Sequence, residues 1–92
     1  MNPDLSARAE LFDFPCPFPL KIMGAKHEDF SITIIEVIRQ HAPDFQAHEA
    51  QIRESKGGNY LAMTATITAV SREQLDALYL ALTGHPMVKV VL

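Results

Sequence analysis

The sequence lacks several features that would place it in a well-defined class of protein. Its one cysteine cannot form an internal disulfide, and no apolar run approaches the ~20 residues that a membrane-spanning helix needs. Residues 1–10 are polar and carry no hydrophobic core of a secretory signal peptide. Together these absences predict a cytoplasmic protein that does not cross a membrane.

Positive charge is scarce as well. Eight lysines and arginines stand against eleven aspartates and glutamates, which gives a formal net charge of -3, and the two signs are mixed along the chain. The chain therefore lacks the basic excess that binds nucleic-acid phosphates or anionic lipid headgroups. We expect no nucleic acid and no membrane among its partners.

The residues that are present have the composition of one globular domain. Hydrophobic residues make up 48% and charged residues 21% of the 92 positions, unlike the composition of disordered chains. A chain of this length is too short to build two independent cores. Because the first residues show no apolar periodicity, we expect a flexible tail over residues 1–11 and a single domain over residues 12–92.

Apolar spacing predicts six secondary-structure elements. We expect a strand over 18–24, a helix over 28–41, a polar edge strand over 46–54, a strand over 60–70, a helix from Ser71 to Gly84 and a strand over 87–92. The first strand overlaps a stretch that contains Pro15, Pro17 and Pro19. Because prolines lack an amide donor, we expect this stretch to be extended but not to belong to a central strand.

Both expected helices have one apolar stripe and recognisable ends. Pro43 stops the first helix, and Glu28 suits its positive N-terminal end. Ser71 followed by Gln74 is typical of a capping box at the start of the second helix, and we expect Gly84 to close that helix in the left-handed conformation. The stripes consist of Phe30, Ile34, Val37, Ile38 and His41 in the first helix and of Leu75, Leu78, Tyr79 and Leu82 in the second.

The two middle strands are joined by a tight turn. Adjacent glycines in residues 56–59 predict a hairpin, and the strand after it directs Leu61, Met63 and Ile67 toward the helices. With right-handed crossovers, the order of elements predicts an α+β, ferredoxin-like βαββαβ domain. Its four-stranded antiparallel sheet has the order 4-1-3-2, with two helices on one face.

A set of short motifs occurs in order along the folded part of the chain. They are Phe14-Pro15, Phe18, Lys21-Ile22-Met23-Gly24, His41-Ala42-Pro43, Ser55-Lys56-Gly57, Asn59-Tyr60 and a terminal Val-Leu. This set resembles the YbeD-like family of small bacterial proteins of unknown function, over residues 12–92. It departs at Gly57-Gly58, where that family has a single glycine. The resemblance implies a domain similar to ACT regulatory domains, which often bind amino acids at the first strand–helix loop and between paired domains, and it implies no known activity.

Residue types that carry catalysis or bind metals occur without the partners that such chemistry needs. None of His27, His41, His48 and His85 lies three or four residues from another, and no Cys-x-x-Cys pair is present. Cys16 has no visible base that would activate its thiol. We therefore expect no enzyme, no catalytic residue, no metal site and no cofactor.

Two functional classes that share this fold lack their signatures here. The first loop has Lys26 but not the arginine with which acylphosphatases hold a phosphate. The stretch 56–63 keeps one ring, Tyr60, of the aromatic pattern on which RRM domains stack RNA bases. We expect neither activity.

Two surfaces are candidate binding sites. One is the loop between the first strand and the first helix, where free helix amides attract an anion and the candidate residues are Gly24, Lys26, His27 and Glu28. The other is the sheet face without helices, which carries an apolar patch. Its candidate residues are Lys21, Met23, Tyr60, Thr64, Met87, Lys89 and Val91.

These surfaces lead to two hypotheses. In the first, the protein is an ACT-like regulatory module that binds a small polar metabolite at the loop and pairs with itself. In the second, it is a ligand-free interaction module that docks onto another protein through the open sheet face or the last strand. Because residues 87–92 are apolar on both faces of an edge strand, we expect a homo-oligomer or a protein partner.

Overall fold

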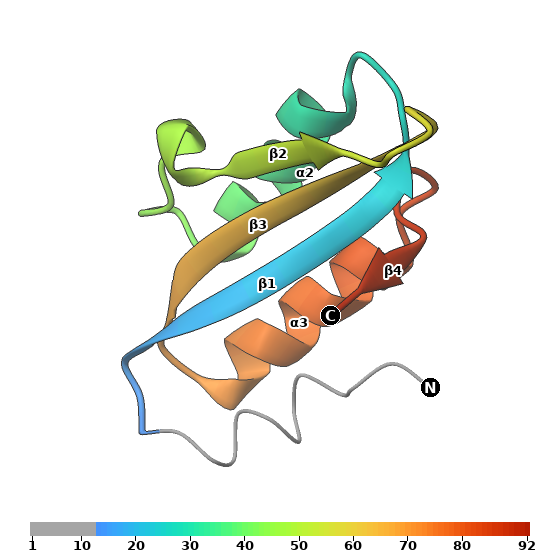
Figure 1. The fold of residues 1–92 in the computed structure, drawn as a ribbon. Helices are drawn as coiled ribbons and strands as arrows, with labels where there is room; N and C mark the ends of the chain where they lie inside the picture. The colour runs from blue at the N-terminus through green and yellow to red at the C-terminus, as the bar shows by residue number, and fades with distance from the viewer. Residues whose placement is uncertain (1–12) are drawn as a thin grey trace.

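The computed structural model describes residues 13–92, whose arrangement is shown in Figure 1. The expected tail over residues 1–11 lies outside this described part. The elements, in chain order, are β1 (Cys16–Ala25), α2 (Phe30–His41), a short 3-10 helix η1 (Ala47–Glu49), β2 (Gln51–Glu54), β3 (Tyr60–Ala69), α3 (Arg72–Thr83) and β4 (Val90–Val91). This order confirms the predicted α+β class.

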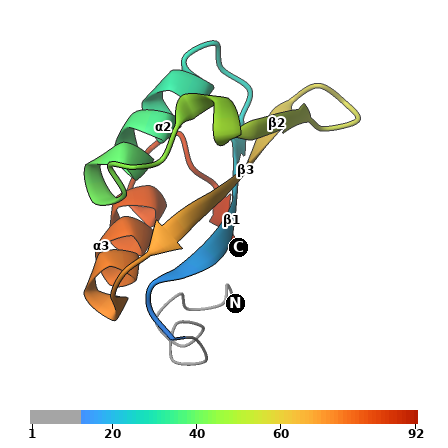
Figure 2. The same ribbon diagram turned by 90° about the vertical axis from the view of Figure 1, so that its left-hand side faces the viewer.

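The strands form one antiparallel sheet with the predicted topology. In residues 13–92, four strands pair in the order β2-β3-β1-β4. β1 and β3 pair along their whole length, from Cys16 opposite Ala69 to Ala25 opposite Tyr60. Figure 2 shows α2 and α3 together on one side of the sheet, and no helix of the described chain covers the other side.

The hydrophobic core lies between this sheet and the two helices α2 and α3. Strand alternation directs one set of side chains toward the helices, and the helical period directs the apolar stripes back toward the sheet. Met63 and Ile67 of β3 are buried as predicted, and Leu61 packs against the core partly buried. The largest fully buried side chains are Phe18, Leu20, Ile22, Phe30, Ile34, Ile38, Met63, Ile67, Leu75, Leu78 and Leu82.

Helix α2 begins two residues later than predicted. Glu28 and Asp29 form a turn, and the Phe30 amide donates to the His27 carbonyl at 3.1 Å. The helix ends at His41 as predicted, because the chain turns there toward a proline that cannot continue the helix. The turn of residues 26–29 therefore separates β1 from α2 and sets the geometry of the first loop.

The prediction that the proline-rich stretch lies outside a central strand is wrong. β1 begins at Cys16, and Pro17 and Pro19 belong to this inner strand. Lys21, which faces the same edge of β1 as the prolines, exchanges backbone hydrogen bonds with Leu92 on the β4 side. β4 is short and pairs farther along β1. No strand of the described chain therefore lies beside the prolines, and their missing amide donors leave no gap in the ladder.

The edge strand β2 is shorter than the predicted strand over 46–54. The first half of that range forms η1, where the Gln46 amide donates to the Glu49 carboxylate at 3.0 Å in a reciprocal cap. The second half is an exposed strand at the sheet edge, as predicted. The hairpin turn is also confirmed, with Gly58 in the left-handed region at φ 73.

Gln74 ties the start of α3 to two other elements. Its backbone amide donates to the Ser71 hydroxyl at 3.0 Å, which confirms the Ser71 half of the predicted capping box, whereas the Gln74 side chain bonds Val70 in place of the Ser71 amide. Its side-chain oxygen accepts a hydrogen bond from the Val70 amide at 2.7 Å, and its side-chain nitrogen donates to the His41 carbonyl at 2.9 Å. The partly buried Gln74 side chain therefore links the first turn of α3 to the end of β3 and to the end of α2.

We expect Gln74→Ala to lower the free energy of unfolding by about 2 kcal/mol, because the side-chain hydrogen bonds to Val70, His41 and, at 3.4 Å, to the Thr68 carbonyl are lost. Urea unfolding followed by circular dichroism measures this change. Leu80→Ala is the control, since Leu80 lies exposed on the same helix, and its effect is expected to stay below about 0.5 kcal/mol. Equal losses in the two variants would show that Gln74 has no special role.

The predicted left-handed cap at Gly84 is wrong. Gly84 has φ -84 and is right-handed, and its amide donates to the Leu80 carbonyl at 3.0 Å. The next amide, from His85, reaches the Leu82 carbonyl at 3.1 Å. The helix therefore ends by tightening into a turn rather than by reversing its backbone.

The last strand is shorter than predicted, and Val91 lies on the other face of the sheet. Only Val90–Val91 forms β4, with Val91 opposite Ile22 and Val90 opposite Met23. Val91 points to the helices and is fully buried, so its predicted place on the open face is wrong. Nearly every residue of this segment is apolar, so alternation carries no information on which face is buried.

Gly24 allows the segment before β4 to lie close to β1. A Cβ atom at this position would overlap the Met87 carbonyl oxygen and would lie 2.7 Å from the Phe30 ring. Met87 itself packs partly buried against the core, so its predicted place on the open face is also wrong. Gly24 therefore has a structural reason to lack a side chain.

Candidate functional site

The first candidate site, the loop after β1, is largely engaged with the chain itself. Gly24 is buried beneath Met87, as described above. The Lys26 side chain forms an ion pair with Glu54 of β2, and the Lys26 amide donates to the Asn59 carbonyl at 2.9 Å. These contacts hold Lys26 against the hairpin and away from the start of α2.

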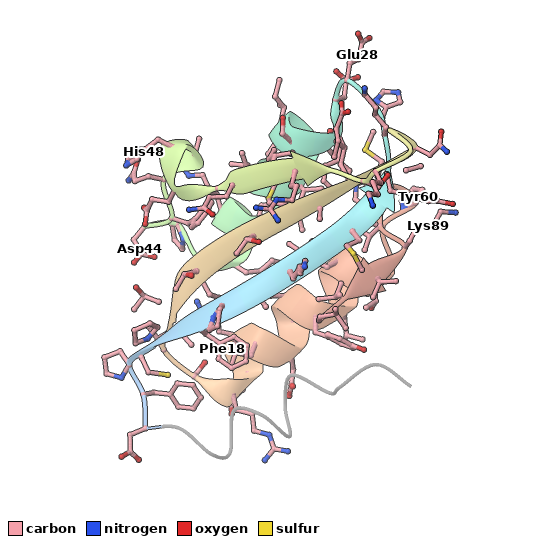
Figure 3. The ribbon with its side chains drawn as sticks, viewed as in Figure 1. Phe18, Glu28, Asp44, His48, Tyr60 and Lys89 are labelled. Carbon is pink, nitrogen blue, oxygen red and sulfur yellow. The ribbon has the colours of Figure 1, made fainter. Side chains whose placement is uncertain are left out.

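His27 and Glu28 complete this loop and are exposed. The Nδ1 atom of His27 accepts a hydrogen bond from the Asp29 amide at 3.0 Å, and Glu28 extends away from the sheet in Figure 3. Two carboxylates, those of Glu28 and Asp29, therefore stand beside the first amides of α2. Because like charges repel, this arrangement does not favour an anion at the loop.

The second candidate site, the open sheet face, is a grid whose rows follow the strand register. Lys21 of β1 lies opposite Thr64 of β3, which lies opposite Gln51 of β2. Residues that face each other in neighbouring strands project from the same side of a sheet. The next row contains, from the β4 edge to the β2 edge, Val90, Met23, Ala62 and Arg53.

Several of the predicted residues do lie on this face. The structure places Lys21, Met23, Tyr60 and Thr64 there, and Tyr60 is 53% exposed. Lys89 is exposed beside them, and Figure 3 shows it at the same end of the sheet as Tyr60. An apolar and aromatic surface therefore adjoins a lysine at this end.

Two grooves lie on the open face and share three residues. One has a volume of about 320 Å³ and reaches Gln51 and Thr64, and the other, of about 180 Å³, reaches Met23 and Tyr60. The shared residues are Lys21, Arg53 and Ala62. Because alanine has a short side chain, Ala62 leaves a shallow depression between the two cations.

The two shared cations have no carboxylate partner in the described chain. Within residues 13–92, the short contacts between opposite charges join Lys26 to Glu54 and His27 to Asp29, and they involve neither Lys21 nor Arg53. No strand residue that projects from the open face in this range is an aspartate or glutamate. Glu54 also lines the smaller groove, but its carboxylate pairs with Lys26. Lys21 and Arg53 therefore leave a net positive charge at the two grooves, on a chain whose net charge is -3.

Another groove, of about 430 Å³, lies along the outer side of α2. It is formed by that helix and the turn after it, and it carries both Glu36 and Arg39. Apolar contact comes from Ile32, which is exposed, and from Ile35. Its single cation is matched by a single carboxylate, whereas Lys21 and Arg53 outnumber Glu54 at the open-face grooves, so this groove has the weaker charge selectivity.

The sequence model of a family described as "Protein of unknown function (DUF493)" matches residues 9–92. The chain belongs to this family. A UPF0250 protein of Chromobacterium violaceum is 60% identical over 85 residues, which cover 92% of this chain and 96% of that protein. A UPF0250 protein of Ralstonia nicotianae is 50% identical over 91 residues, which cover 99% of this chain and 94% of that protein. Membership confirms the resemblance to the YbeD-like family, and the printed names assign no activity.

Sequence reasoning missed two residues of the open face of this DUF493 chain, Gln51 and Arg53. The signal that finds them is the hairpin turn, in which the Ser55 amide donates to the Tyr60 carbonyl at 2.9 Å. Counting outward from that pair places Arg53 opposite Ala62 and therefore on the same face. The glycines predict the turn, and the register that the turn imposes extends along the whole of β2.

The open face of the DUF493 chain offers positive charge, hydroxyl and amide groups, and one aromatic ring. Among residues 13–92, no three histidine, cysteine, aspartate or glutamate side chains are placed to hold a metal ion. Helices α2 and α3 have 12 residues each, and no helix in this range has the length and hydropathy to cross a bilayer. The groups on the open face can form ion pairs, hydrogen bonds and apolar contacts with a bound molecule.

Proposed function

We propose that this DUF493 protein is a regulatory binding module that performs no catalysis and docks onto a protein partner through its open sheet face. The observation that carries this proposal is the pair of grooves around Lys21 and Arg53, which lie beside Tyr60 and Met23 on a face without helices. Aromatic residues, methionine and arginine are the types enriched at protein interfaces.

The apolar part of this face supports docking by a macromolecule. Tyr60 is half-exposed, Met23 and Val90 are partly exposed, and Leu92 is 38% exposed. These side chains line two neighbouring strands and the β4 edge, so they form one patch rather than scattered contacts. A partner that covered the patch would remove this apolar area from water.

A second candidate function is the binding of a small polar metabolite. It is favoured by the groove of about 320 Å³, whose lining includes Lys21, Gln51, Arg53 and Thr64. These side chains offer donors for a carboxylate, and the volume suits a small ligand. Stabilisation by free amino acids or small carboxylates in a thermal-shift screen would favour this candidate over docking.

The docking proposal is tested by photocrosslinking in bacterial cells that express the chain. We expect p-benzoylphenylalanine in place of Tyr60 to form a discrete crosslinked product with another protein, because this side chain lies in the proposed interface. The product is identified by mass spectrometry, and the purified partner is expected to bind the purified chain and to lose binding on Tyr60→Glu.

The control places the same photoreactive residue at Leu80, which is 69% exposed on α3. Figure 2 shows α3 on the side of the sheet away from the open face. We expect no discrete product from this position. The same pattern of products from both positions, or no product from Tyr60, would contradict docking through the open face. Thermal unfolding of each variant checks that the domain is folded.

A further inference from the structure

We infer that the occupant of the open sheet face is an acidic, extended segment of a partner protein, held by Lys21 and Arg53. This inference rests on the proposed function and specifies the chemistry of the partner. Its basis is the charge of the face: two cations that share two grooves and have no carboxylate partner in residues 13–92. An incoming carboxylate would supply that missing partner.

The spacing of the two cations fits a chain in extended conformation. Lys21 lies on β1 and Arg53 on β2, with β3 between them, so their backbones are two strand spacings apart across the sheet, roughly 9–10 Å. Arg53 also lies one row farther along the strands than Lys21, an offset of roughly 6.6 Å. Both side chains are long, and both line the shallow depression over Ala62. In an extended segment, side chains two residues apart lie on one face, about 6.6 Å from each other. Carboxylates at i and i+2 can therefore meet both cations.

The rest of the face gives such a segment a direction. Tyr60 and Met23 lie at one end of the shared surface, whereas Gln51 and Thr64 lie at the other end. An apolar side chain at i+4 can contact the ring of Tyr60 while the two carboxylates pair with Lys21 and Arg53. The face therefore fits a pattern of two acidic residues followed by an apolar one, each separated by one residue.

A second copy of this chain fits the face less well. A two-fold symmetric contact places each surface against itself, so Lys21 and Arg53 of one copy would approach Lys21 and Arg53 of the other. No described strand residue that projects from the open face is a carboxylate, and Glu54, which lines the smaller groove, is already paired with Lys26, so little offsets this repulsion. Charge complementarity therefore favours an acidic partner over stacking of two open faces.

The probe is a short fluorescein-labelled peptide with glutamates at i and i+2, leucine at i+4 and serine between them. A matched peptide carries glutamine in place of each glutamate. We expect fluorescence polarisation with the full chain to show saturable binding of the glutamate peptide, at least about tenfold tighter than the glutamine peptide. Binding is expected to weaken as NaCl rises from about 50 to 300 mM, because salt screens exposed charges.

Two double variants locate the binding surface. Lys21→Gln with Arg53→Gln is expected to weaken binding of the glutamate peptide about tenfold, since both cations are lost. Arg39→Gln with Lys56→Gln removes the same net charge from exposed positions outside the face, and it is expected to change the affinity less than about twofold. Circular dichroism confirms that all variants keep the fold.

Several results would overturn the acidic segment. These are equal binding of the glutamate and glutamine peptides, equal losses in the two double variants, and binding of free succinate as tight as that of the peptide, which would point to a small anion. Dimerisation that strengthens when Lys21 and Arg53 are neutralised would point to a second copy. Crosslinking from Tyr60 together with any of these results would leave the proposed docking function in place and remove only the acidic partner.

Discussion

Gly24→Ala is expected to lower the free energy of unfolding by about 3 kcal/mol, at the upper end of the cost of overpacking a core. The added methyl group would overlap the Met87 carbonyl oxygen and press on the Phe30 ring. The ring can rotate, but the carbonyl belongs to the backbone, so the segment before β4 has to move. For a domain of this size, each kcal/mol corresponds to a fall in Tm of roughly 4–8 °C.

Two measurements and a matched glycine test this expectation. Urea unfolding reports the loss of stability, and amide hydrogen exchange reports whether β4 separates from β1, since the Lys89 amide donates to the Met23 carbonyl at 2.7 Å. Gly57→Ala is the control, because a Cβ there meets only the Asn59 side chain at 3.5 Å. A Gly24→Ala variant as stable as the Gly57→Ala variant would contradict the close approach of Met87 to β1.

The parts of the fold that could be predicted from the sequence are those whose local pattern has one solution. In β3, small and apolar residues alternate with threonines, and the buried set, including Met63 and Ile67, is the predicted one. The first helix has a single apolar stripe, and Phe30, Ile34 and Ile38 are fully buried. Period and polarity agree in these elements, so local sequence was sufficient.

Predictions failed where a contact between distant segments decides the outcome. Which of Val90 and Val91 is buried depends on the residue opposite each in β1, and two adjacent valines carry no alternation. The length of β4 depends on how Met87 crosses Gly24, a contact that local sequence does not encode. The prediction for the prolines of β1 fails for a related reason: β4 is too short to reach Pro17 and Pro19, and the local sequence around the prolines does not encode the length of β4.

The candidate site was predicted in part for the same reasons. Lys21 and Thr64 could be placed on the open face because their own strands alternate. Arg53 could not be placed by alternation, since β2 is short, polar and exposed on both sides. At the first loop, the free amides of a helix N-terminus predict an anion-binding site. Local sequence does not show that Lys26 pairs with Glu54, because the two residues lie far apart in the sequence.

Phe18→Ala is expected to cost about 3–5 kcal/mol, the range for removal of a buried aromatic ring. Phe18 lies between two prolines, yet its side chain is fully buried, opposite Ile67 in the β1–β3 ladder. Small domains have a total stability of about 5–15 kcal/mol, so this one change consumes a large share of it. Urea unfolding is expected to show a lower midpoint with a similar m-value, because the folded state buries nearly the same surface.

The variant Pro19→Ala is the control, because it changes the backbone beside Phe18 and leaves the Phe18 ring in place. Pro19 is exposed and lies at the part of the β1 edge that β4 does not reach. Pro19→Ala is therefore expected to lower the free energy of unfolding by less than about 1 kcal/mol, mainly because the unfolded chain gains conformational freedom. The same substitution restores an amide donor at an uncovered strand edge, where it increases the tendency of chains to pair. Sedimentation velocity at rising concentration measures that tendency. A loss from Phe18→Ala no larger than the loss from Pro19→Ala would mean that the proline-rich half of β1 is not part of the core.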